Sequence, residues 1–308
     1  MSRTMIAWVA MLLSAFGEAS GAQATTPPPA PQNPSPMAEL TRTHERLTQT
    51  PPNGTVRTFT GPAAKPVELL IPSGIHKRDA FDLVIHFHGA AWIPQQAVTA
   101  LNSRTVSATL NLGSGSGVYD RSFTDPATFD TLLATITREV SAATNRTSRI
   151  AHVTLTGFSA GHGSIRAILR DPRHFAVVGS VLLIDGMHTS YIPEGRVIAL
   201  GGTIDTTNLA AFTNFARAAM RGEKQFLITH SEIFPGTFVS TTETADWLVK
   251  TLGIQRKPVL RWGPRGTQQL SEARAGKFEL RGYAGNSAPD HIDQFHAMPE
   301  LLKQLRSR

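Results

Sequence analysis

The sequence predicts an α/β fold in which a mostly parallel central sheet carries helices on both faces. Short apolar runs typical of strands alternate with stretches of helical periodicity after about residue 55. The run Phe81–Phe87 is almost continuously apolar, as expected of a strand that is buried on both faces. No internal linker or repeat divides this part, and its length suits one α/β domain with a full core.

Each element follows from its local pattern. The expected strands are Thr55–Thr60, Pro66–Ile71, Phe81–Phe87, Val106–Leu112, Ile150–Thr156, Val177–Ile184, Gln225–Thr229 and Phe278–Tyr283. The expected helices are Asp125–Ala143, Ala160–Arg170, Thr207–Met220, Thr241–Leu252 and a closing amphipathic segment, His291–Arg306. Asp125 is expected to cap its helix with Pro126 at the first helical position, and Thr241 or Thr242 caps another.

Residues 1–24 have the pattern of a secretory signal peptide. A short basic start is followed by the apolar run Met5–Phe16 and by Ala22-Gln23-Ala24, which fits the pattern that signal peptidase cleaves. The apolar run is too short to span a hydrocarbon core that needs roughly 20 residues. We therefore expect cleavage after Ala24, no transmembrane helix, and a secreted or periplasmic protein.

Residues 25–54 form a second N-terminal segment, which we expect to be disordered. The stretch Thr25–Pro36 holds six prolines and almost no large apolar side chains, so it cannot bury enough surface to offset its ordering entropy. The α/β domain is therefore expected to occupy residues 55–308.

Composition excludes several classes of site and partner. The chain has no cysteine, which rules out disulfides, cysteine nucleophiles, thiolate zinc sites and iron–sulfur clusters. Its net charge of +7 suits a soluble basic surface or attraction to anionic cell-wall polymers or lipid head groups. No stretch alternates several aromatic residues with basic ones, so nucleic acid is not an expected partner. No metal or organic cofactor is expected, because no ligand spacing such as H-E-x-x-H occurs.

The segment Gly157-Phe158-Ser159-Ala160-Gly161 is a G-x-S-x-G motif between an expected strand and an expected helix. A serine on such a sharp turn is held in a strained conformation with its hydroxyl exposed, and the glycines let strand and helix approach. The start of the following helix directs free N–H groups toward developing negative charge. Ser159 is therefore the expected nucleophile.

A second motif, His88-Gly89-Ala90-Ala91, follows the strand Phe81–Phe87. With the serine motif it resembles the esterase/lipase branch of the α/β-hydrolase superfamily. That resemblance implies an oxyanion hole formed by backbone N–H groups, one from Ala160 after the nucleophile and one from Ala90 or Ala91. Alanines stand here where those enzymes commonly have glycines. His88 is expected to bond to backbone, and His162 to be a packing or substrate contact.

The resemblance places the catalytic histidine between the last strand and the last helix. The segment from Ala284 to His291 occupies that position, and His291 is the favoured base, with His296 as the alternative. The orienting acid is expected at a strand end, at Asp185 or at Glu232. Asp185 is favoured because it directly follows an apolar run and precedes a glycine.

Together these features predict an exported serine hydrolase that acts on carboxylic esters of small or polymer-borne substrates. Between Asp185 and the helix near Thr207 there are only about 20 residues, which leaves room for a small cap or none. Three alternatives remain open: an acyltransferase or a peptidase with the same triad, and a non-catalytic binding module on the same fold.

Overall fold

The computed structural model describes residues 44–306 except residues 78 and 103. The expected signal peptide and most of the proline-rich segment therefore lie outside the described residues. Within the described part, none of the helices combines the length and the apolar character that a membrane crossing requires.

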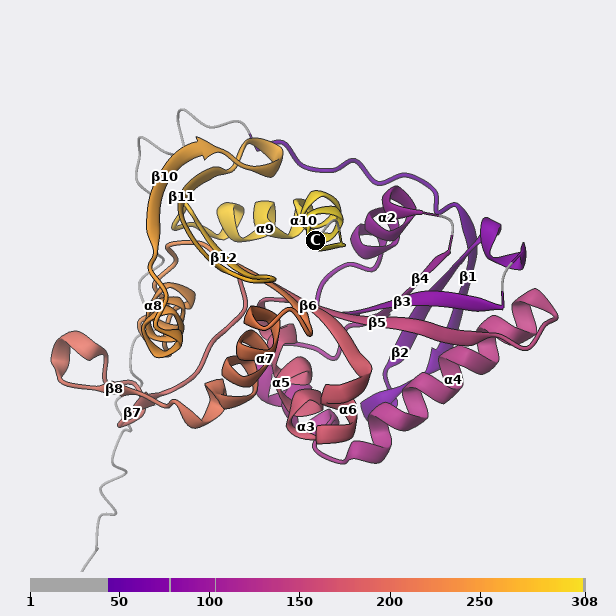
Figure 1. The fold of residues 1–308 in the computed structure, drawn as a ribbon, viewed down its shortest axis with the longest axis horizontal. Helices are drawn as coiled ribbons and strands as arrows, with labels where there is room; N and C mark the ends of the chain where they lie inside the picture. Colours follow the sequence, from indigo (N-terminus) through magenta and orange to yellow (C-terminus); the bar gives the residue numbers. More distant parts are fainter. Residues whose placement is uncertain (1–43, 78, 103, 307–308) are drawn as a thin grey trace, which may run out of the picture. The chain divides into compact units, whose positions relative to one another are not determined.

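A single large sheet runs through the domain (Figure 1). Its strands are β1 (Gly54–Thr60), β2 (Pro66–Pro72), β3 (Ala80–Phe87), β4 (Thr105–Leu110), β5 (Arg149–Phe158), β6 (Val178–Ile184), β9 (Gln225–His230), β10 (Lys257–Trp262), β11 (Gln268–Ala275) and β12 (Phe278–Tyr283). Their spatial order is β1-β2-β4-β3-β5-β6-β9-β12-β11-β10. The central run from β4 to β12 is parallel, and antiparallel strands extend it at both edges. The predicted mostly parallel sheet is thus confirmed.

The helices follow the strands in the alternation that the sequence predicts. They are α2 (Trp92–Leu101), α3 (Ser116–Ser122), α4 (Pro126–Thr144), α5 (His162–Arg170), α6 (Pro172–Val177), α7 (Ala210–Met220), α8 (Thr241–Leu252), α9 (Ala288–His296) and α10 (Met298–Arg306). Short 3₁₀ turns are η1 (Pro62–Ala64), η2 (Ser73–Lys77), η3 (Ser159–Gly161), η4 (Ile198–Leu200), η5 (Thr207–Leu209) and η6 (Pro264–Gly266). A small hairpin, β7 (Tyr191–Ile192) with β8 (Thr203–Ile204), projects from the segment between Asp185 and Thr207.

Two apolar layers hold helices on opposite faces of the sheet (Figure 1). On one face, side chains of α2, α9 and α10 pack with sheet residues such as Val84 and Leu182. On the other face, side chains of α4, α5, α7 and α8 pack with the alternate set, including Leu83 and Leu183. Successive strand residues point to opposite faces, so each central strand supplies both layers and must be apolar throughout.

Several elements differ from the sequence-based expectations. The sequence analysis missed the helices α2, α3 and α6 and the strands β10 and β11. α2 carries Pro94 in its first turn, where the missing N–H costs nothing, and β10 is a largely exposed edge strand with little apolar alternation. The cap of α8 is Ser240, in a capping box with Glu243, and neither Thr241 nor Thr242.

Residues 44–53 were expected to be disordered, yet they lie against the domain. The backbone N–H of Leu47 donates to His296 Nδ1 at 3.0 Å, and Thr50 N–H donates to the Gln96 side chain at 3.1 Å. Arg46 forms an ion pair with the buried carboxylate of Asp293 at 2.8 Å. These polar contacts order a segment whose own apolar content is too low to predict packing.

Candidate active site

Ser159 lies at the carboxyl end of β5, where the strand turns into η3 and α5. Its φ is +47°, in the left-handed region that non-glycine residues seldom adopt, so the turn stores strain at this serine. Gly161 makes the turn possible, because a Cβ there would lie 2.0 Å from the carbonyl oxygen of Phe87 on β3. The expected sharp strand-to-helix turn is present, and Ser159 is half-buried on it.

Asp185, at the carboxyl end of the neighbouring strand β6, is joined to His291. The His291 Nδ1–H donates to Asp185 Oδ2 at 2.7 Å. The carboxylate is 2% exposed and also accepts hydrogen bonds from Ser231 N at 2.8 Å, Ser231 Oγ at 2.6 Å and Thr241 Oγ1 at 2.9 Å. Burial alone would raise the pKa of Asp185, but the hydrogen bonds from His291 and Ser231 outweigh it and hold this pKa well below its ordinary value. The Asp185 carboxylate is therefore ionised at neutral pH.

The two alternative residues lie elsewhere. Glu232 is exposed, and its backbone N–H donates to the carbonyl oxygen of Gly285. His296 is 9% exposed and packs edge-to-face on Trp92, while its Nδ1 accepts the bond from Leu47. Of the candidate acids and bases, the pair that makes a hydrogen bond is Asp185 and His291.

His291 lies within a helix that begins at Ala288, whereas the sequence analysis expected the closing helical segment to begin at His291 itself. It lies in the first turn of α9, whose N-cap Ser287 forms a capping box with Asp290. Pro289 stands within that first turn, where proline is tolerated. The capping box explains why the helix starts before His291. It also means that a helix, which is more rigid than a loop, carries the imidazole.

Phe158 connects the histidine to the serine turn. Its ring lies 4.4 Å from the His291 ring and 4.7 Å from the parallel ring of Phe295, centroid to centroid. From the acid side, a Cβ on Gly186 would come within 2.4 Å of Ser159 O, so Asp185 and the serine turn are in backbone contact. The Ser159 hydroxyl makes no hydrogen bond to the residues that the structure describes. Such bonds are often long or unformed before a substrate binds.

The His-Gly turn after β3 is held by the same aromatic cluster. His88 and Gly89 have φ of +75° and +105°, and a Cβ on Gly89 would lie 2.6 Å from the ring of Phe295. His88 Nδ1 bonds to the Tyr119 hydroxyl at 2.9 Å, and the ring also makes the expected backbone contact, a hydrogen bond to Gly113. The carbonyl of Ala90 accepts a bond from Ile93 N–H and so begins the turn into α2.

A cavity of about 570 Å³ opens beside Ser159. It is lined by Gly115, Ser116, Gly117, Ser159, Ala160, His162, Arg166, His188, Thr189, Ser190, Asn208 and Phe238. Gly115, Ser116 and Gly117, at the start of α3, thus contribute to it. The sequence analysis did not single out Arg166 or His188. Arg166 could have been found from its position four residues after His162 on the helix that leaves the serine turn.

The two cavity histidines are neutral at neutral pH. His162 Nδ1–H donates to the carbonyl oxygen of Ser159 at 2.8 Å, and burial lowers its pKa to about 3. His188 Nδ1–H donates to the Val239 carbonyl at 3.1 Å, and burial lowers its pKa as well. His162 therefore holds the backbone of Ser159, and neither ring contributes charge to the cavity.

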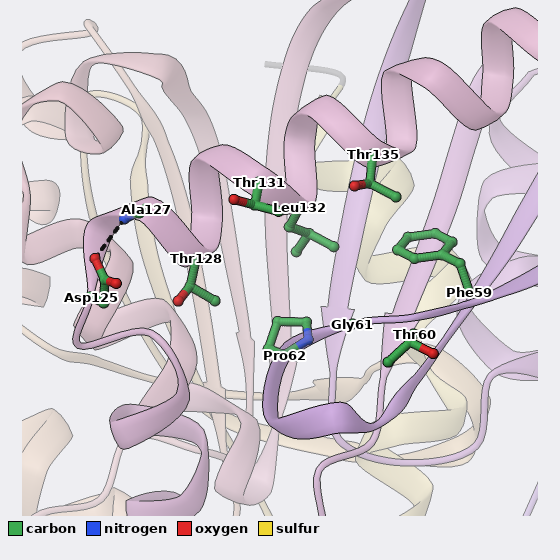
Figure 2. Close-up of a pocket in the computed structure, with 10 residues that line it drawn as sticks. All are labelled: Phe59, Thr60, Gly61, Pro62, Asp125, Ala127, Thr128, Thr131, Leu132 and Thr135. Carbon is green, nitrogen blue, oxygen red and sulfur yellow. Dashed lines mark hydrogen bonds between the residues drawn. The ribbon is translucent and has the colours of Figure 1, made fainter.

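A second cavity, of about 310 Å³, lies between the edge of the sheet and α4 (Figure 2). Threonines of α4, including Thr128 and Thr131, face Phe59 and Pro62 across it. Its single carboxylate, Asp125, accepts the Ala127 N–H at 2.9 Å and caps α4, as the sequence predicts. This cavity contains no histidine or paired acid and so offers no comparable chemistry.

The parallel strand order, the serine turn after β5, and the acid and histidine that follow β6 and β12 define the architecture. This is an α/β-hydrolase fold. In this fold, side chains at the carboxyl edge of the sheet converge above the strands, and Ser159, Asp185 and His291 all lie at that edge.

No family model matches the chain, and no curated protein matches it in sequence. Several solved structures are similar to it over most of its length. The match to Est1E from Butyrivibrio proteoclasticus covers 82% of this chain and 99% of Est1E, at 9% identity and a TM-score of 0.41. Thermogutta terrifontis esterase 2 covers 84% and 96%, at 13% identity and a TM-score of 0.46. Poly(aspartic acid) hydrolase-1 from Sphingomonas sp. KT-1 covers 84% and 100%, at 14% identity and a TM-score of 0.45.

Proposed function

We propose that the chain is a serine hydrolase that cleaves carboxylic esters through an acyl-enzyme. Ser159 Oγ attacks the ester carbonyl while Nε2 of His291 takes its proton, and the alcohol leaves with that proton. Water then attacks the acyl-serine by the same route and releases the acid. Asp185 holds the imidazole in the tautomer that leaves Nε2 free, and it stabilises the imidazolium that forms.

The hydrogen bond between His291 and Asp185 is the observation that carries this proposal. An ionised acid that is buried at the carboxyl edge of the sheet is costly unless a cationic or hydrogen-bonding partner offsets its desolvation. Here that partner is a histidine whose ring packs on Phe158, the residue directly before the strained Ser159. This combination of groups favours nucleophilic catalysis over a purely structural ion pair.

The backbone N–H groups of Ala160 and Ala90 are the proposed oxyanion donors. Ala160 follows the nucleophile at the start of η3, and Ala90 follows the His-Gly turn of β3, so the donors come from adjacent strands. Removal of one such donor elsewhere costs about 3–4 kcal/mol of transition-state stabilisation. The alanine side chains do not prevent Ala90 and Ala160 from forming an oxyanion hole, because the donors are backbone N–H groups.

Export remains a proposal as well, based on the pattern of residues 1–24. The mature protein would begin at Thr25 and would be secreted or periplasmic. N-terminal sequencing of the protein from the extracellular or periplasmic fraction tests this, and an intact Met1 in a cytoplasmic fraction would contradict it.

Hydrolysis of short 4-nitrophenyl esters tests the proposed reaction. The wild-type chain should turn them over, and Ser159→Ala should reduce kcat by roughly 10⁶-fold while circular dichroism remains unchanged. Ser122→Ala, on α3, is the matched control, because its hydroxyl only bonds to the Val118 carbonyl on its own helix. Turnover by Ser159→Ala at the wild-type rate would contradict the proposal. Amide substrates in the same assay test for peptidase activity, and added alcohol acceptors test for acyltransferase activity.

A further inference from the structure

The cavity beside Ser159 has one charged lining residue, Arg166. None of the residues that line it is acidic, and burial keeps His162 and His188 neutral. Arg166 is 8% exposed, so its guanidinium has little bulk water to solvate it. A buried guanidinium next to an open cavity provides a strong and directional attraction for an anion.

The contacts of Arg166 use one of the five N–H donors of its guanidinium. Its Nε–H donates to Asp120 Oδ2 at 2.7 Å, whereas the other Asp120 oxygen accepts from Arg170 Nη1 at 3.1 Å. Neither terminal nitrogen of Arg166 has a protein partner within the described part of the chain. Two arginines thus share one carboxylate, and the group retains a net positive charge.

A purely structural ion pair would look different. Arginine–carboxylate pairs are frequently bidentate, with two parallel N–H···O bonds. Here the pair tying α5 to α3 uses Nε alone, and the two Nη groups of Arg166 remain for a ligand. Because side chains on a helix lean toward its N-terminus, this guanidinium leans along α5 toward Ser159. Arg166 follows Ser159 by seven residues, through η3 and α5, and a helical rise of about 1.5 Å per residue places the anion site within roughly 10 Å of Ser159.

We propose that the preferred substrate is an ester that carries a carboxylate, bound by the terminal nitrogens of Arg166 while Ser159 attacks the ester carbonyl. This inference rests on the proposed function and names the substrate class of the same site. Among the described residues, Arg166 is the one cationic residue that lines the cavity, so the charge of the site matches that of a monoanion. A carboxylate is therefore favoured over a phosphate dianion. The span of roughly 10 Å corresponds to a linker of a few carbons between ester and carboxylate.

Matched pairs of esters test the inference without assuming which side of the ester carries the charge. On the acyl side, mono(4-nitrophenyl) adipate is compared with its neutral adipamate analogue. On the alcohol side, 4-(butyryloxy)butanoate is compared with 4-(butyryloxy)butanamide. In at least one pair the wild-type chain should prefer the carboxylate by about tenfold or more in kcat/KM, as expected of a charge-assisted contact.

Variants then assign the preference to Arg166. Arg166→Gln should lower the ratio of the two kcat/KM values to about one, and Arg166→Lys should retain part of it because the charge remains. The ratio cancels any general loss of active enzyme. Arg170→Gln is the control, because Arg170 shares the same Asp120 but does not line the cavity. Its ratio should stay within about twofold of the wild-type value, as expected for an exposed pair.

The outcomes separate the inference from the function on which it rests. Equal turnover of both members of both pairs by the wild-type chain would overturn the inference and leave the ester hydrolase intact. A carboxylate preference that survives in Arg166→Gln would overturn the role of Arg166. Failure of the wild-type chain to hydrolyse any of the four esters would contradict the proposed function, and the inference with it. If Arg166→Gln does not fold, the wild-type ratios and Arg166→Lys still decide.

Discussion

The Asp185 carboxylate accepts a hydrogen bond of 2.7 Å from Nδ1 of His291, a residue that follows it by 106 positions in the chain. The bond links the end of β6 to the first turn of α9. It determines which imidazole nitrogen carries the proton, so Nε2 is available to accept one. Asp185 also accepts bonds from Ser231 and Thr241, which orient it independently of the histidine.

Removal of the Asp185 charge should abolish most of the activity. Asp185→Asn keeps the shape of the side chain but cannot stabilise an imidazolium and favours the wrong tautomer. We expect kcat for a 4-nitrophenyl ester to fall by about 10³–10⁴. Steady-state kinetics of the purified variant measure this effect.

Glu232→Gln provides the matched comparison, since Glu232 also follows a strand at the same edge of the sheet. Its side chain is exposed, so kcat should change by less than about tenfold. The reverse pattern, with a large loss in Glu232→Gln and a small one in Asp185→Asn, would transfer the role of the acid to Glu232.

The backbone contact between Gly186 and Ser159 should be needed for activity. In Gly186→Ala the new Cβ would meet Ser159 O at 2.4 Å and Ser159 N at 2.7 Å, and neither backbone atom can move without displacing Ser159. Misplacement of about 1 Å costs on the order of 10²-fold in rate, so kcat/KM should fall at least that far.

Gly179→Ala, on β6, the strand that precedes Gly186, is the control. Its Cβ would lie 3.7 Å from Val153 O, an ordinary contact, so activity should remain near the wild-type value. Equal activity of Gly186→Ala and Gly179→Ala would mean that Ser159 is not held by this contact.

Buried histidines should make the fold less stable in acid. Burial lowers the pKa of His86 from 6.5 to about 3, while in the unfolded chain the ring titrates normally. The unfolded state therefore binds a proton below pH 6.5 and the folded state does not until about pH 3. Stability is fully present above pH 6.5 and is lost as the pH falls, by about 1.4 kcal/mol per pH unit for this ring.

Urea unfolding at pH 7, 6, 5 and 4 measures this slope. His86→Asn should lose stability at pH 7, because the ring bonds to Thr156 and to the His88 carbonyl are removed. Its slope with pH should nevertheless be smaller than that of the wild type by about 1.4 kcal/mol per pH unit. An unchanged slope in His86→Asn would show that His86 is not the source of the acid sensitivity.

Much of the fold could be predicted from the sequence because the central strands are apolar throughout. The run Phe81–Phe87 matches β3 (Ala80–Phe87), and Asp125 caps α4. Elements without that signal were missed. β10 is polar and largely exposed, and α2 has a proline near its start, so pattern and propensity point away from the conformation that packing imposes.

The candidate site could be predicted in part. Ser159 is marked by a local motif, and Asp185 by the end of an apolar strand, so both positions follow from neighbouring residues. The contact of Asp185 with His291 depends on the tertiary fold, and so does the position of Arg166 beside the cavity. The capping box of Ser287 and Asp290, which starts α9 before His291, was visible in the sequence but was not recognised.

Covalent labelling of the serine tests the central claim most directly. The wild-type chain should react with a fluorophosphonate probe in a one-to-one ratio, and peptide mass spectrometry should place the adduct on Ser159. His291→Ala should react far more slowly, because the base that activates the hydroxyl is gone. Absence of labelling in a folded wild-type chain, or an adduct on another serine, would contradict the claim that Ser159 is an activated nucleophile.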